Sequence, residues 1–114
     1  MAVPATQNLT ITRGDTETLV ITIKNSASVA TDITGRTYRA QIRSTKDSGT
    51  IAAAFTCVVT TPLAGVVTCT LTPNQTSVLP TGTQFWDFEE TITSSGVVTT
   101  IVAGTVNVLA DVSR

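Results

Sequence analysis

Apolar and polar residues alternate along short segments of this chain, and turn-forming residues separate the segments. The clearest alternation lies in residues 37–44, where tyrosine, alanine and isoleucine are separated by arginine, glutamine and arginine. This pattern places one face of a strand in the core and leaves the other in solvent, which is typical of antiparallel sheets. The same reasoning predicts the other strands. They lie at 7–12, 17–24, 51–60, 66–72, 83–93, 97–102 and 105–109.

Segment 72–80 carries the signals of a helix instead. Thr72 can cap a helix, Pro73 suits the first helical position, and Pro80 prevents continuation. We therefore expect one helical turn here that crosses from one sheet to the other. Gly104 stands between the last two predicted strands, where we expect a bulge or kink.

Seven or eight short strands at a spacing of about 8–12 residues predict an all-β protein, an immunoglobulin-like antiparallel β-sandwich with one short helical turn. No segment has the pattern of a helix long enough to connect parallel strands, so a parallel sheet is not expected. Of the 114 residues, 47 are Thr, Val or Ile, and these β-branched side chains favour strands over helices. The length fits a single domain over residues 1–114.

Composition narrows the chemistry. The chain has no histidine, which removes histidine bases, Ser–His and Cys–His pairs and most zinc sites. A formal net charge of −1 supplies no cationic field for nucleic acid or an anionic membrane. No apolar run approaches the roughly 20 residues of a membrane span, and residues 1–6 lack the features of a signal peptide. We therefore expect no enzymatic activity, cofactor, metal, nucleic acid or membrane partner.

Charged residues on two strands are the candidates for contact with another protein. Asp87 and Glu89 share one strand face, as the carboxylates of a glycosidase or a calcium site could. An extended strand splays such groups apart, however, and pairing with Arg39 and Arg43 on a neighbouring strand is the favoured interpretation. Complementary charges of this kind can orient a protein partner, so we take these four as protein-contact candidates.

The predicted strand 83–93 contains three of the aromatic residues and one conflict between local pattern and fold. Trp86 is expected to fill the core between the sheets, and the alternative is a stacking platform for sugar. Phe85, on the opposite face, is the candidate for an exposed aromatic side chain. Glu90 shares the parity of Trp86 and should point inward. It must then lie at the open end of the sandwich or contact an arginine.

Cys57 and Cys69 are equally distant from Leu63, at the centre of a predicted hairpin loop. They should therefore lie opposite each other in the core. Two small buried hydrophobic residues are the favoured interpretation, and a disulfide is the alternative. Nothing cationic stands nearby in the sequence to activate a catalytic thiol.

Three short motifs carry little weight. Arg13-Gly14-Asp15 matches a cell-adhesion tripeptide, but we interpret it as a turn between two strands. Asn8-Leu9-Thr10 and Asn74-Gln75-Thr76 match the glycosylation triplet, and we treat both as accidental.

Several of these pieces occur in an order that resembles a known family. They are LTITRGDT at 9–16, DITG at 32–35, LTP at 71–73 leading to LPTGT at 79–83, WDFE at 86–89, and a last piece running from 104–106 to 111–114. The chain resembles the small immunoglobulin-like β-sandwich of virion proteins of tailed bacteriophages, and is similar to the N-terminal domain of phage baseplate upper proteins. The resemblance implies attachment to another virion protein and carries over no catalytic residue.

The resemblance also implies a location and partners. In larger relatives a receptor-binding or coiled-coil part follows this domain, whereas here Arg114 comes directly after the last predicted strand. We therefore expect a capsid decoration (cement) protein, made in the host cytoplasm and bound as a homo-oligomer to the major capsid protein. The alternatives are a tail or baseplate adaptor that contacts tail or baseplate proteins, and a host-recognition component that binds glycan.

Overall fold

Strands make up most of the computed structural model, which describes residues 5–24, 27, 29–45 and 51–112. The all-β prediction is therefore confirmed. The last piece of the family resemblance falls partly on 113–114, and the segment 1–6 without the features of a signal peptide falls partly on 1–4, both outside the described residues. The elements are β1 (Ala5–Thr6), β2 (Leu9–Thr12), β3 (Glu17–Thr22), β4 (Arg36–Arg43), β5 (Ala53–Thr61), η1 (Pro62–Ala64), β6 (Val66–Leu71), α1 (Pro73–Ser77), β7 (Gly82–Ile92) and β8 (Val97–Leu109).

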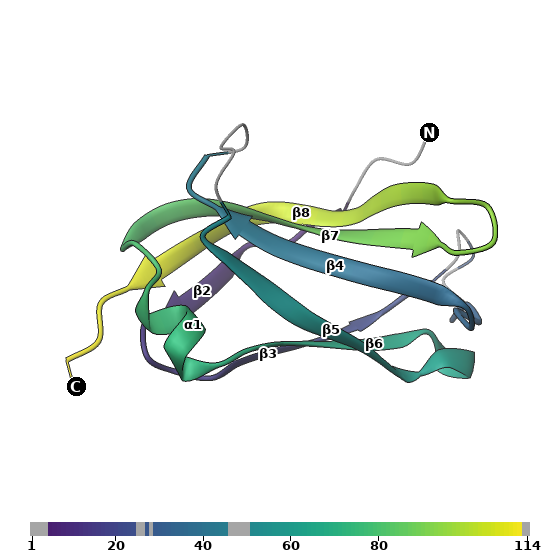
Figure 1. Cartoon of the computed structure of the whole chain (residues 1–114), viewed down its shortest axis with the longest axis horizontal. Coiled ribbons are helices and arrows are strands. Elements are labelled where there is room, and N and C mark those ends of the chain that lie inside the picture. The colour runs from purple at the N-terminus through teal and green to yellow at the C-terminus, as the bar shows by residue number, and fades with distance from the viewer. Residues whose placement is uncertain (1–4, 25–26, 28, 46–50, 113–114) are drawn as a thin grey trace.

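The strands form one continuous hydrogen-bonded path in the order β1-β8-β7-β4-β5-β6-β3, and β2 also pairs with β8. The path folds over so that β8, β7 and β4 lie above β6 and β3 in Figure 1. β5 joins the two layers, because it pairs with β4 over residues 53–55 and with β6 from Thr56 onward.

One edge differs from the expected antiparallel arrangement. Both β1 and β2 pair with β8 in parallel, so the expectation of a wholly antiparallel sheet was wrong at this edge. Parallel neighbours need a long connection between them. Here the connection is the rest of the fold, because these strands come from opposite ends of the chain. These parallel strands therefore need no crossover helix. The lack of such a helix in the sequence was for this reason no argument against parallel pairing.

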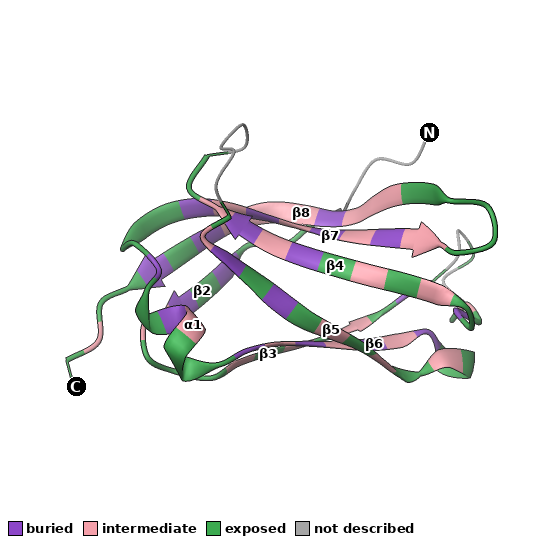
Figure 2. Cartoon of the chain, in the orientation of Figure 1, coloured by how far each residue is buried: buried purple, intermediate pink, exposed green. Residues whose placement is uncertain are grey.

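The core lies between the layers, and buried residues alternate with exposed ones along most strands (Figure 2). Trp86 is only 3% exposed, and its Nε1 donates to the Gln7 carbonyl oxygen over 2.8 Å. Its ring lies 6.2 Å from that of Phe55, and Tyr38 stacks on Phe88 at 5.2 Å. Trp86 therefore fills the core as expected, and little of its ring is exposed for stacking on a sugar.

The helical turn has the predicted position. α1 begins at Pro73 and connects β6 to β7, which are not neighbours in the strand path. Thr72 Oγ1 accepts from the Gln75 backbone N–H while the Gln75 side chain accepts from the Thr72 N–H, which forms a complete capping box.

The turn before β3 is tied to the helix. The Arg13 guanidinium donates to the Ser77 carbonyl oxygen over 2.7 Å, and the Gly14 N–H donates to Thr76 Oγ1 over 3.0 Å. Thr76 Oγ1 in turn donates to the Asp15 carbonyl oxygen. The tripeptide therefore forms a turn, as predicted, and its arginine packs against α1.

Gly104 does not interrupt the last strand, contrary to expectation. β8 runs unbroken from Val97 to Leu109, and its register shift against β7 lies instead between the Val102 and Thr100 pairs. The glycine is required by close approach of another backbone. A Cβ at Gly104 would overlap the Gln7 carbonyl group, whose carbon would lie 2.8 Å away.

We predict that Gly104→Ala lowers the free energy of unfolding by about 1–3 kcal/mol, because the added methyl must displace the Gln7 backbone. Urea unfolding measures the loss. Thr105→Ala is the matched control, since only the backbone N–H of Thr105 contacts Asn8. Equal stability of the two variants would contradict this explanation.

Candidate functional site

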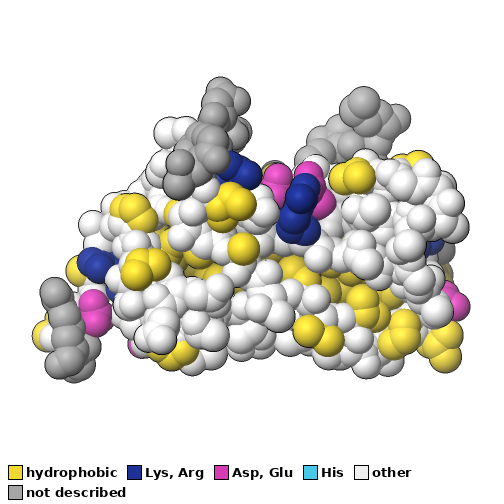
Figure 3. Space-filling model, viewed as in Figure 1, with side chains coloured by type: hydrophobic (Ala, Val, Ile, Leu, Met, Phe, Trp, Pro, Cys, Tyr) yellow, Lys and Arg dark blue, Asp and Glu magenta, His cyan; other side chains and the backbone are white. Residues whose placement is uncertain are grey.

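The outer face of β4, β7 and β8 carries a hollow of about 590 Å³. All four protein-contact candidates from the sequence line it, together with Phe85 and Gln41. Thr6 and Asn8 close its border from the N-terminal edge. We call this feature the β4–β7 hollow. The space-filling view shows arginine or lysine side chains beside acidic ones along the upper border of the molecule, with few other charges nearby (Figure 3).

Register explains why these residues meet. Arg39 pairs with Glu89, Gln41 with Asp87, and Arg43 with Phe85. Side chains two residues apart share a strand face. Because the intervening positions are core residues, the charged set must face outward. Those core residues are Ala40, Ile42, Trp86 and Phe88.

Arg39 and Glu89 form an ion pair, as the sequence suggested. Arg39 Nη2 and Nε both approach Glu89 Oε1, at 2.6 and 3.1 Å. The hydrogen bonds and charge of Glu89 raise the pKa of Arg39 above its ordinary value. The Arg39 side chain is 65% exposed, and exposed pairs contribute little to stability. The pair therefore sets the orientation of two charges more than it holds the fold together.

Asp87 occupies a less favourable environment. Partial burial raises the pKa of its carboxyl group, and the neighbouring Glu89 raises it further. Arg39 and Arg43 act in the opposite direction but do not offset the rise. Arg43 Nη2 also donates to Gln41 Oε1 over 3.2 Å. An ionised carboxylate is thus held in the hollow at some cost to stability.

Phe85 is half-buried on the outer face, directly opposite Arg43. The sequence singled it out as the candidate for an exposed aromatic side chain, and it does lie outside the core. The hollow therefore combines one aromatic surface with charges of both signs.

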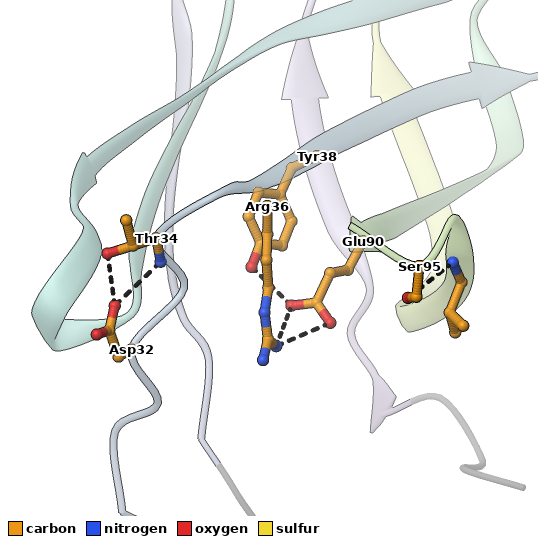
Figure 4. A network of polar contacts seen from close by, with 7 residues as sticks. Asp32, Thr34, Arg36, Tyr38, Glu90 and Ser95 are labelled. Atoms are coloured by element: carbon orange, nitrogen blue, oxygen red, sulfur yellow. Dashed lines mark hydrogen bonds and ion pairs between the residues drawn. The ribbon is translucent and has the colours of Figure 1, made fainter. Parts of the chain in front are cut away.

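Glu90 belongs to a separate network, in which it is the buried member (Figure 4). It is 5% exposed, and Tyr38 Oη donates to its Oε2 over 2.6 Å. Arg36 Nη1 lies 3.2 Å from Oε1 and 3.3 Å from Oε2. Burial, followed by the hydrogen bond to Glu90, raises the pKa of Tyr38. The expectation that Glu90 points inward and contacts an arginine is confirmed.

Asp87, Glu89 and Glu90 are close in sequence but do not form one site. Glu90 lies inside the fold, while Asp87 and Glu89 lie in the hollow. Among the described residues no group of three or more acidic or cysteine side chains could hold a metal ion.

The two cysteines lie opposite each other on β5 and β6, as predicted, and both are free thiols. Cys69 is buried and Cys57 is half-buried, 3.2 Å apart at sulfur. They face the interior, away from the hollow.

Sequence reasoning missed the contribution of the N-terminal segment. Thr6 and Asn8 border the hollow because β1 and β2 pair with β8. No local pattern in the sequence predicted that pairing. Asn8 belongs to one of the glycosylation triplets, and here its Oδ1 accepts from the Thr105 N–H over 3.1 Å.

Comparison with known protein families found no matching family model, and comparison with curated proteins found no matching sequence. Within the described part of the chain, no helix has the length and apolarity to cross a lipid bilayer.

We predict opposite stability effects on the two faces of β7. Glu90→Gln lowers the free energy of unfolding by about 1–3 kcal/mol, because it weakens the part-buried hydrogen bonds that Arg36 and Tyr38 donate to a buried carboxylate. Glu89→Gln breaks the exposed pair with Arg39 but also relieves the repulsion of Asp87, so it costs less than about 1 kcal/mol. Chemical unfolding of both variants at neutral pH compares them, and a larger loss for Glu89→Gln would contradict the assigned roles.

We predict that Asp87→Asn stabilises the fold at pH 7 by up to about 1 kcal/mol. The folded pKa of Asp87 is raised, so its ionised form favours the unfolded state. The difference from wild type should shrink as the pH falls through the folded pKa and disappear below the unfolded value of about 3.9. Unfolding measured from pH 3 to 7 tests this.

Asp32→Asn is the control of opposite sign. Hydrogen bonds from the Thr34 side chain and backbone lower the pKa of Asp32, so its ionised form favours the folded state. Its removal should destabilise the protein at pH 7 and become neutral in acid. The same sign for both variants would refute the electrostatic account of the hollow.

Proposed function

We propose that this protein is a non-enzymatic structural component of a tailed-phage virion, bound to the capsid lattice as a decoration protein. One observation carries the proposal: the β4–β7 hollow holds Arg39, Arg43, Asp87 and Glu89 on two rigidly paired strands. The family resemblance of the sequence supplies the virion context. The major capsid protein is the proposed partner.

The proposed fold is an immunoglobulin-like sandwich. β3, β6 and β5 follow the order expected for one layer of that fold, and β4, β7 and β8 follow the order of the other. The parallel β1 and β2 at the β8 edge, and the switch of β5 between layers, are departures from the seven-strand pattern.

Charge in the hollow favours docking over catalysis. Arg39 and Glu89 are held by each other, so neither side chain loses much freedom when a partner binds. Asp87 is ionised at a cost, and a basic side chain of a partner would offset that cost. Complementary charges of this kind set orientation and partner choice. We therefore propose a partner surface with a basic group opposite Asp87.

The opposite layer supports a second contact, with another copy of the chain. Its exposed side chains are uncharged and β-branched, and pack in rows across β3, β6 and β5. We call this the threonine face, and its exposed members are Thr18, Val20, Thr22, Thr56, Val58 and Thr60. Such a face loses little hydration when covered. β3 ends the strand path and offers an edge for strand addition between copies.

Phe85 supports a second candidate function, which is sugar binding. A half-buried ring beside arginine, glutamine and aspartate is suited to a sugar, which would make the protein a host-recognition component. A tail or baseplate adaptor would use the same charged surface against a different protein.

We predict that Arg39→Glu weakens binding to capsids assembled without this protein by about tenfold or more. Glu89→Arg should act likewise. The double variant keeps an ion pair within the hollow but reverses its direction, so its binding should remain weak. Co-sedimentation with capsids, with copies per particle counted by quantitative mass spectrometry, measures the effect.

Lys24→Glu is the matched control, because it makes the same change of charge outside the lining of the hollow. Full binding by the double variant would show that the partner does not sense the direction of the charge pair. Binding to tails instead of capsids would favour a tail or baseplate adaptor over a capsid decoration protein. Binding to neither, with sugar affinity lost in Phe85→Ala, would favour host recognition.

A further inference from the structure

Cys57 and Cys69 form a direct cross-strand pair. β5 and β6 are antiparallel, and these two residues occupy one register position. Leu19 of β3 continues the same row beyond Cys69. Residues directly opposite in antiparallel strands have Cα atoms about 4.5 or 5.5 Å apart, and both values lie within the range of about 4.4–6.8 Å that a disulfide spans.

The sulfur atoms are already close. Cys69 Sγ lies 3.2 Å from Cys57 Sγ, and a disulfide bond needs about 2.05 Å. The remaining approach is of the order that small side-chain rotations supply, without movement of the backbone. Both thiols are free, so the structure shows the reduced form.

The two thiols differ in pKa and in exposure, and the difference determines which of them reacts first with an external disulfide. The hydrogen bond from the Cys69 thiol lowers the pKa of Cys57, which is the half-buried member of the pair. The same hydrogen bond, followed by burial, raises the pKa of Cys69. Cys57 is therefore the thiol that an external disulfide meets first, and Cys69 is positioned behind it.

We propose that Cys57 and Cys69 are an oxidation site, at which a small-molecule disulfide closes an intramolecular disulfide between β5 and β6. This inference is independent of the proposed virion role, because it needs only the pair geometry and an oxidant such as glutathione disulfide.

The reaction has two exchange steps. The Cys57 thiolate attacks one sulfur of glutathione disulfide, forms a mixed disulfide and releases one glutathione thiolate. Cys69 then loses its proton, attacks Cys57 Sγ and releases the second glutathione. Two electrons pass from the two thiols to glutathione disulfide, and two protons end on the released glutathione. In the mixed disulfide, Cys57 is no longer a thiolate that accepts the hydrogen bond from the Cys69 thiol. Cys69 therefore loses its proton more easily, which favours the second step.

The folded protein, incubated with excess glutathione disulfide and then alkylated in denaturant, tests the proposal. We expect a monomer lighter by two hydrogens, with no alkylated cysteine and with the loss of two hydrogens located in the tryptic peptide 47–114, which contains both residues. The closed loop should also raise the Tm by about 5–15 °C relative to the reduced protein.

Single variants separate the roles of the two thiols. In Cys69→Ala the first step has no second thiol to follow it, so Cys57 should accumulate as a stable glutathione adduct. In Cys57→Ala the buried Cys69 should stay unmodified over the same period. Circular dichroism checks that each variant is folded. If Cys69→Ala is unfolded, the time course of the wild type serves instead, with the mixed disulfide expected at Cys57 before closure.

Three outcomes would overturn the proposal. The first is a wild type that keeps two alkylatable thiols while Cys69→Ala becomes glutathionylated, since the pair would then be unable to close. The second is oxidation that yields covalent dimers between chains. The third is closure of the wild type with a fall in Tm, because the disulfide would then strain the fold instead of fitting it.

Discussion

The pairing of β4 with β7 is the constraint on which the rest of this structure depends. The two strands are in register from Arg36 opposite Ile92 to Arg43 opposite Phe85. Because a strand presents alternate residues to opposite faces, this one register puts the aromatic core inside and the charged hollow outside. A shift by one residue would expose Trp86 and bury Asp87, so the cost of burying unpaired charges enforces the register.

Glu90 is the exception that this register has to accommodate. It stands on the inner face, where an unpartnered carboxylate would be costly. Tyr38 lies directly opposite it, and Arg36 lies one diagonal step away, so the cross-strand partners that the register supplies are also those that neutralise it. The network thus follows from the same pairing that builds the hollow.

Much of the architecture could be predicted from local pattern. Alternation located β4 and β7, the Thr72–Pro73 pair located α1, and symmetry about Leu63 placed the two cysteines opposite each other. The four hollow residues were found because two charges of each sign stood at the same parity on two predicted strands. Prediction failed at the β8 edge. The parallel strands and the role of Gly104 both depend on a backbone from the other end of the chain.

The sequence by itself determined which residues form strands, which face of each strand is apolar, and that histidine chemistry is absent, since these properties reside in single residues and their spacing. Only the tertiary structure decided that Thr6 and Asn8 border the hollow, that Arg36 and Tyr38 are the partners of Glu90, and that β5 passes between the layers. Such outcomes depend on which strands become neighbours. That choice is made by packing of the whole chain, and segments distant in sequence carry no local mark of it.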